Sequence, residues 1–192
     1  MGNNTQSPSR DSKGDEEIHR YILNKRLKVF NTRNVLDISF LLRGKLKMQE
    51  ILEKLDKDVL KLICKGNDWR DLNQLSPLMI KLEKLKKLNV KKNKLKEMNE
   101  EIIKFDQLES LNISNNPITK IPEQIGKLEN LKKLDSSFTM IKELPCGFSK
   151  LIKIERLDLS HCSLIGFFFF SLFFFFLPNF FFFNQKHFLL PF

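Results

Sequence analysis

The sequence is poor in the residues on which phosphate, metal and disulfide sites depend. Its seven glycines are dispersed and form no G-x-G-x-x-G or G-x-x-x-x-G-K loop that would hold a phosphate. Its three cysteines, Cys64, Cys146 and Cys162, are too few and too scattered for a disulfide framework, and no pair has zinc-knuckle spacing. We therefore expect no cofactor, no metal and a reducing, intracellular setting.

Histidine is equally scarce, which argues against catalysis. Of the three histidines, only His161 lies beside a nucleophile, Cys162, within the patterned part of the chain. A Cys–His dyad needs both side chains oriented into one cleft, whereas adjacent residues on a strand point to opposite faces. The sequence predicts that the protein is not an enzyme and that Cys162 has a structural role.

The first residues also lack a long apolar run. The stretch "MGNNTQSPSRDSKGDEE" has no hydrophobic segment of a secretory signal, and its polar composition predicts a disordered leader over residues 1–15. Gly2 raises the possibility of N-myristoylation, although the usual Ser or Thr at position 6 is replaced by Gln6. An unmodified tail is the alternative.

What the sequence does contain is an internal repeat. Four segments, "LKKLNVKKNKLKEM", "LESLNISNNPITKI", "LKKLDSSFTMIKEL" and "IERLDLSHCSLIGF", start 23 residues apart. Their matching columns include Leu88, Leu111, Leu134 and Leu157, then Val90, Ile113, Ser136 and Leu159, then Asn93, Asn116, Thr139 and Cys162. So many aligned columns indicate a stack of similar structural units.

This pattern resembles the leucine-rich repeat family, in its intracellular, Ras-suppressor-like form L-x-x-L-x-L-x-x-N-x-L-x-x-L-P-x-x-I-x-x-L. The segment "LESLNISNNPITKIPEQIGKL" follows that form almost position by position. The resemblance implies an α/β solenoid with short parallel strands on a concave face and irregular or short helical arms on the convex side. It also implies protein binding as an adaptor or scaffold in cytoplasmic signalling.

The residues support this fold independently. Leu88 and Val90 alternate with polar neighbours, as in a short strand with one buried face. Asn93 lies where the chain turns out of the strand, and its amide can both donate to and accept from buried backbone groups. Pro122 in "KIPEQIGKLENL" favours a turn or the start of a short helix. A single unit cannot bury its apolar face, so stability must come from stacking.

The repeats are predicted over residues 59–164, with a period of 23–26 residues. An earlier unit, "VLKLICKGNDWRDL", is spaced by 26 residues from the next, and a fainter echo, "VLDISF", lies another 26 residues back. Residues 16–58 are predicted to form a helical N-terminal cap, because "MQEILEKLDKDVLKL" places its apolar residues on one helical face. A partner-binding amphipathic helix is the alternative for this segment.

The concave face of such a solenoid consists of the outward-pointing strand and turn residues, and equivalent positions in adjacent repeats lie about 5 Å apart. The candidate partner-binding residues on it are Lys87, Asn89, Lys91, Asn112, Ser114, Lys133, Asp135, Phe138, Arg156, Asp158 and His161. Phe138 is the residue type that commonly anchors a protein partner. Alternatively, it turns inward to fill the gap beside Ser136, a small residue in a core column.

The formal charge of +10 could direct the protein toward acidic partners, nucleic acid or anionic lipid, and "KLEKLKKLNVKKNKLKEM" concentrates lysine. On a solenoid these lysines divide among strand, turn and convex side, and the stretch lacks the interleaved aromatics of a single-strand binder. We therefore expect a protein partner, with contact to nucleic acid or lipid the minor alternative.

Residues 165–192 form a Phe-rich, low-complexity tail that interrupts the last repeat. Phe, Leu, Ser and Pro have pyrimidine-rich codons, so we interpret this tail as a splicing or gene-model artefact. The alternative is a tail-anchored membrane protein that displays the repeats, since Ile165 to Phe183 is uncharged and long enough to span a bilayer. A non-catalytic regulatory subunit of an enzyme complex is a further alternative for the function.

Overall fold

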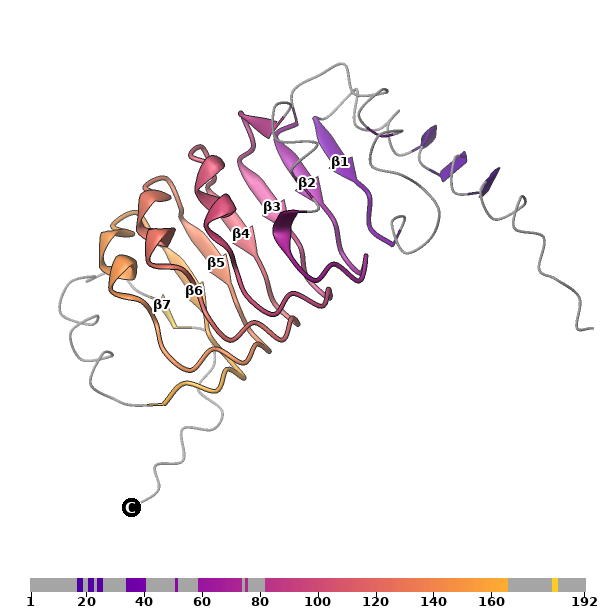
Figure 1. Cartoon of the computed structure of the whole chain (residues 1–192). Coiled ribbons are helices and arrows are strands. Elements are labelled where there is room, and N and C mark those ends of the chain that lie inside the picture. Colours follow the sequence, from indigo (N-terminus) through magenta and orange to yellow (C-terminus); the bar gives the residue numbers. More distant parts are fainter. Residues whose placement is uncertain are drawn as a thin grey trace, which may run out of the picture.

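Three-residue strands, stacked in chain order, build the molecule. The computed structural model describes residues 17–18, 21–22, 24–25, 34–40, 51, 59–73, 75, 82–165 and 181–182. All strands pair in parallel in one open sheet, as Figure 1 shows. The strands are β1 (Val35–Asp37), β2 (Lys61–Ile63), β3 (Lys87–Asn89), β4 (Ser110–Asn112), β5 (Lys133–Asp135), β6 (Arg156–Asp158) and β7 (Phe181–Phe182).

The strand register follows the repeat columns. Leu88 pairs with Leu62 on one side and with Leu111 on the other, and the same column continues through Leu134 to Leu157. These leucines are buried, whereas the residues before and after each of them are exposed or half-buried. One row of leucines therefore forms the centre of a continuous core that runs the length of the stack, as the alternation predicts.

Short 3₁₀ helices form the return segments. They are η2 (Glu100–Lys104), η3 (Glu123–Lys127) and η4 (Cys146–Lys150), and Figure 1 shows them on the side of the array away from the strands. Pro122 and Pro145 occupy the N-cap positions of η3 and η4, where an extended backbone and a missing N–H are tolerated. The α/β solenoid with short helical convex arms is thus confirmed.

The last two helices pack so closely that glycine is required between them. A Cβ atom on Gly147 would lie 1.9 Å from the backbone oxygen of Glu123. The carboxylate of Glu123 also accepts hydrogen bonds from the N–H groups of Cys146 and Gly147, at 3.2 and 2.8 Å. Glu123 of one repeat therefore caps the first turn of the helix in the next repeat.

The sheet starts earlier than the predicted repeat boundary at residue 59. Strand β1 lies inside segment 16–58, at the fainter echo, and pairs with β2. Residues 17–18, 21–22, 24–25 and 51 are helical, but the described part of segment 16–58 is too fragmentary to test a cap. The cap therefore stays a prediction.

Several other predictions lie outside the described residues. These include the disordered leader, Gly2 and its modification, and the Phe-rich tail apart from Ile165 and the backbone of β7. In the described ranges, no helix combines the length and the apolar character needed to cross a bilayer.

Candidate functional site

The outward face of the sheet ends in a recurring turn that holds its own polar residues. The side-chain Oδ1 atoms of Asn112, Asp135 and Asp158 accept the backbone N–H of the residue two positions later, at 2.9–3.1 Å. Asp37 and Asn89 do the same at the ends of β1 and β3. All five side chains therefore use an oxygen atom to form the turn itself. This leaves them fewer hydrogen-bonding groups for a partner.

Ser114 does not belong to the exposed face. It is fully buried, and its hydroxyl donates to Asn112 Oδ1 at 2.8 Å. Ser137 repeats this contact with Asp135 at 2.7 Å. The prediction that Ser114 contacts a partner is contradicted by this burial, because a serine two residues after the strand folds back onto the turn. Lys91, in the same column, is half-buried.

The asparagine side chains of this column satisfy buried backbone groups, as predicted, and the structure shows that they do so across neighbouring repeats. Asn116 Oδ1 accepts the backbone N–H groups of Asn93 and Leu95, at 3.1 and 3.2 Å, while its amide donates to the carbonyls of Val90 and Ile113, at 3.1 and 2.8 Å. Asn93 makes equivalent contacts to the repeat before it. In the column's later positions, Thr139 Oγ1 and Cys162 Sγ both donate to the Ser136 carbonyl, at 2.8 and 3.2 Å.

Phe138 points outward. Its side chain is 54% exposed, and its ring stacks on His161 with the ring centroids 4.2 Å apart. The inward-turned alternative is therefore wrong: Ser136 in the core column is fully buried, and its hydroxyl donates to the Asp158 carbonyl at 3.1 Å. The two stacked rings, Phe138 and His161, form a small aromatic ledge at the rim of the concave face.

A left-handed backbone places these rings at the rim. Phe138 and His161 have φ values of 55° and 56°. The equivalent residues of the earlier repeats share this conformation, and they are Phe40, Gly66, Lys92 and Asn115. The Phe40 ring lies against Gly66, where an added Cβ would be 2.1 Å from a ring carbon. A side chain at this position is therefore directed away from the core in every repeat, whatever its polarity.

Basic side chains form a row along the first positions of the strands. Lys87, Lys133 and Arg156 are exposed at the starts of β3, β5 and β6, and Lys61 is half-buried at the start of β2. Ser110 takes this position in β4. We call Lys61, Lys87, Lys133 and Arg156 the basic row.

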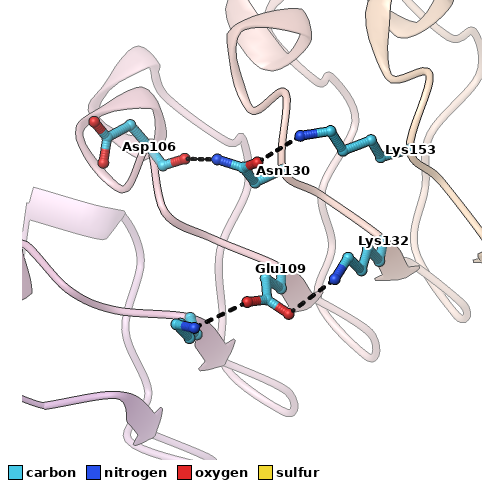
Figure 2. Close-up of polar contacts among 6 residues, drawn as sticks. Asp106, Glu109, Asn130, Lys132 and Lys153 are labelled. Carbon is cyan, nitrogen blue, oxygen red and sulfur yellow. Dashed lines mark hydrogen bonds and ion pairs between the residues drawn. The ribbon is translucent and has the colours of Figure 1, made fainter.

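A separate charge ladder lies one residue before the basic-row position in the repeats of β3, β4 and β5. Glu109 is 3.3 Å from the Lys86 ammonium and 3.4 Å from the Lys132 ammonium. Hydrogen bonds from Lys86 and Lys132 hold the pKa of Glu109 below its ordinary value. Figure 2 shows this bridge beside a second one, in which Asn130 donates to the Asp106 carbonyl and accepts from Lys153, at 3.2 and 2.8 Å.

The Cys162 thiol and the neighbouring His161 ring have different contacts. His161 lies in a turn and Cys162 directly follows it, so neither is on a strand. The two side chains still diverge, because His161 stacks on Phe138 while Cys162 contacts Thr139 and Ser136. Burial raises the pKa of the Cys162 thiol, and it raises that of the fully buried Cys64 thiol further. In the described part of the chain, no cluster of three or more His, Cys, Asp or Glu side chains could hold a metal ion.

The sequence prediction missed the first part of the face. Lys61, Lys65 and Phe40 continue the columns that were traced only from Lys87 onward. The signal was present in the two equal 26-residue steps, and in the Asp37–Ser39 pair, which matches the Asp135–Ser137 and Asp158–Ser160 pairs. Because the segment "VLDISF" was assigned to the N-terminal cap, its residues were not included in the predicted columns of the concave face.

Comparison with known proteins agrees with this geometry. Residues 106–164 match the family model of the leucine-rich repeat. This part of the chain is built of leucine-rich repeats. A search among curated proteins gives no match. The Ras-suppressor-like form of the repeat stays a prediction.

Two solved leucine-rich repeat structures share the fold. One, a protein of Leptospira interrogans, is 26% identical with a TM-score of 0.57, and the match covers 73% of this chain and 41% of that one. The other, an internalin from Listeria monocytogenes, is 16% identical with a TM-score of 0.50, and the match covers 65% and 40%. The chain thus spans about two fifths of the length of either structure. The leucine-rich repeat fold is typical of protein-interaction modules, which are generally non-catalytic.

Proposed function

We propose that this chain is a non-catalytic adaptor that binds a partner protein on its concave face, in cytoplasmic signalling. The observation that carries the proposal is the ledge formed by Phe138 and His161. A large aromatic side chain that stays 54% exposed contributes little to the core, and aromatic residues are enriched among those that dominate binding energy at interfaces.

The surroundings of the ledge support the same use. Lys133 and Arg156 are exposed on the adjacent strands β5 and β6, and Met140, two residues after Phe138, is 54% exposed. An apolar centre with polar and charged residues around it is the usual composition of a protein interface. Because the strands fix the spacing of these side chains, little ordering is needed on binding.

The test removes the ring without disturbing the backbone. Phe138→Asn introduces the residue found at the equivalent position of the preceding repeat, Asn115, which has the same left-handed φ. Ile152→Asn is the matched control, because Ile152 is 73% exposed and lies just after η4, away from the strands. We expect both variants to melt within a few degrees of the unmodified chain.

The readout is capture of proteins from an extract of the source organism, followed by affinity measurement with the purified partner. We expect Phe138→Asn to weaken binding about thirtyfold, as for the loss of an interface hot spot of about 2 kcal/mol. Ile152→Asn should leave binding unchanged. If partners remain bound to Phe138→Asn but are lost with Ile152→Asn, the concave-face proposal is wrong.

A further inference from the structure

The basic row consists of two close pairs with a neutral gap between them. Lys61 pairs directly with Lys87, and Lys133 with Arg156, in the strand register. Ser110 of β4 separates the two pairs. Neighbouring strands are about 4.8 Å apart, so the row extends about 19 Å from β2 to β6.

Nothing in the fold requires this repetition of charge. Like charges directly opposite each other on adjacent strands are destabilising, and Ser110 shows that a neutral residue suits the position. The neighbouring lysines Lys86 and Lys132 bind Glu109. In the described part of the chain, by contrast, no ion pair involves Lys87 or Lys133. Lys87 and Lys133 therefore present positive charge to whatever lies over the face.

The last position of the strand is acidic in β5 and β6 and asparagine in β3 and β4, and the two carboxylates make a phosphate backbone a poor ligand there. Asp135 and Asp158 follow Lys133 and Arg156 two residues later, at the ends of the same strands. Their Oδ1 atoms are held by the N–H groups of Ser137 and Ser160, so these carboxylates stay fixed beside the basic row. A polyphosphate chain would be repelled by them, whereas single carboxylates on separate side chains can reach the row alone.

We propose that the partner of the concave face contributes an acidic, extended segment that crosses the strands over the basic row. In an extended chain, every second side chain points to the same side, at a spacing of about 6.6 Å. Four acidic residues at alternate positions therefore extend about 20 Å, which matches the row from Lys61 to Arg156. This inference rests on the proposed function, because it specifies the partner of the same face.

The test uses labelled peptides and the full chain. The probe carries Glu at four alternate positions of seven, separated by Ser and Thr. One control peptide replaces each Glu with Gln, and a second keeps the four Glu but makes them consecutive. We expect the probe to bind more tightly than both controls in a fluorescence anisotropy titration at low salt, and its affinity to fall steeply as salt rises.

Reversing the charge of two lysines tests whether the probe binds to the basic row. We expect the double variant Lys87→Glu, Lys133→Glu to weaken probe binding on the order of tenfold, because two exposed attractions become repulsions. The matched control, Lys127→Glu with Lys150→Glu, makes the same charge change on the exposed convex helices η3 and η4 and should alter affinity less than twofold. Thermal melting checks that both variants fold.

Other outcomes overturn the inference. These are undetectable binding of the probe, equal binding of the Gln peptide, or an equal loss in the convex variant. Tighter binding of a single-stranded oligouridine that is lost in the Lys87, Lys133 variant would instead make nucleic acid the ligand of the row. If proteins captured through Phe138 bind the charge-reversed variant normally, the acidic-segment inference fails while the proposed function stands. If capture does not depend on the concave face, the proposed function fails as well.

Discussion

At the scale of single residues, polar side chains in the turns hold neighbouring repeats together. Asn116 is 2% exposed, yet both ends of its amide are satisfied by backbone groups of its own repeat and of the one before it. Thr139 and Cys162 replace the amide in the following repeats and bind a single carbonyl, that of Ser136. Because a buried turn leaves backbone groups without water, the column is a structural requirement and not a binding site.

Asn116→Ala is expected to lower the free energy of unfolding by about 2–4 kcal/mol, since it removes the acceptor of the buried N–H groups of Asn93 and Leu95 and the side-chain donor to the Ile113 carbonyl, whereas the Val90 carbonyl keeps its bond from the Asn93 amide. Urea denaturation measures this change. Asn115→Gly is the control, because glycine suits the φ of 55° at that position, and its effect should stay within about 0.5 kcal/mol. Equal losses in the two variants would contradict the role assigned to the Asn116 amide.

At the scale of elements, each three-residue strand is too short to be stable alone, so contacts between repeats determine the structure. The Lys86–Glu109–Lys132 ladder joins the segments that lead into β3, β4 and β5 (Figure 2). Glu123 joins η3 to η4 in a comparable way, by capping it. Both bridges follow from the 23-residue repeat, because it places complementary groups at equivalent positions of successive repeats.

Glu109→Gln tests the ladder through its pH dependence. The folded-state pKa of Glu109 is lowered, so its ion pairs stabilise the protein above the unfolded-state pKa of about 4.3 and lose this effect as the pH falls through the folded-state value. We expect the unmodified chain to exceed Glu109→Gln slightly in stability at pH 7, and the two to converge at pH 3 or in 1 M salt. A difference that persists at pH 3 would show that another interaction was lost.

At the scale of the whole molecule, each repeat protects the backbone N–H groups of its neighbour by hydrogen bonding to them. Backbone N–H groups of one unit donate to carbonyls of the following unit, as from Val90 to Asn112 and from Ile113 to Asp135, both at 2.9 Å. Strand β6 is followed by the two-residue β7, and its core residue Leu159 is 8% exposed where Val90 and Ile113 are fully buried. The centre of the array is therefore better protected than its C-terminal part.

Hydrogen exchange followed by mass spectrometry measures this gradient. We expect peptides that contain β4 to exchange at least tenfold more slowly than peptides that contain β6, because in a linear array local opening starts near the ends. The same gradient should be absent above the denaturation midpoint. Equal protection of β4 and β6 in the native state would indicate that the described repeats open as one cooperative unit.

Much of the fold could be predicted because the hydrophobic spacing requires it. Leu88, Leu111 and Leu134 recur 23 residues apart with polar neighbours, and only stacked strands bury all of them at once. The residues of the concave face were predicted less completely. Lys61 was missed because its repeat is spaced by 26 residues, and Ser114 was misplaced because strand alternation does not continue through the turn that follows β4.

The sequence by itself determined the parallel order of the strands, the leucine core and the role of the asparagine column, because these depend on spacing and residue type. Only the tertiary structure decided that Phe138 points outward, that Ser114 is buried and that Glu109 lies between two lysines. The physical reason is that these outcomes depend on a left-handed turn and on distances between repeats, and neither is encoded in the hydrophobic pattern of one repeat.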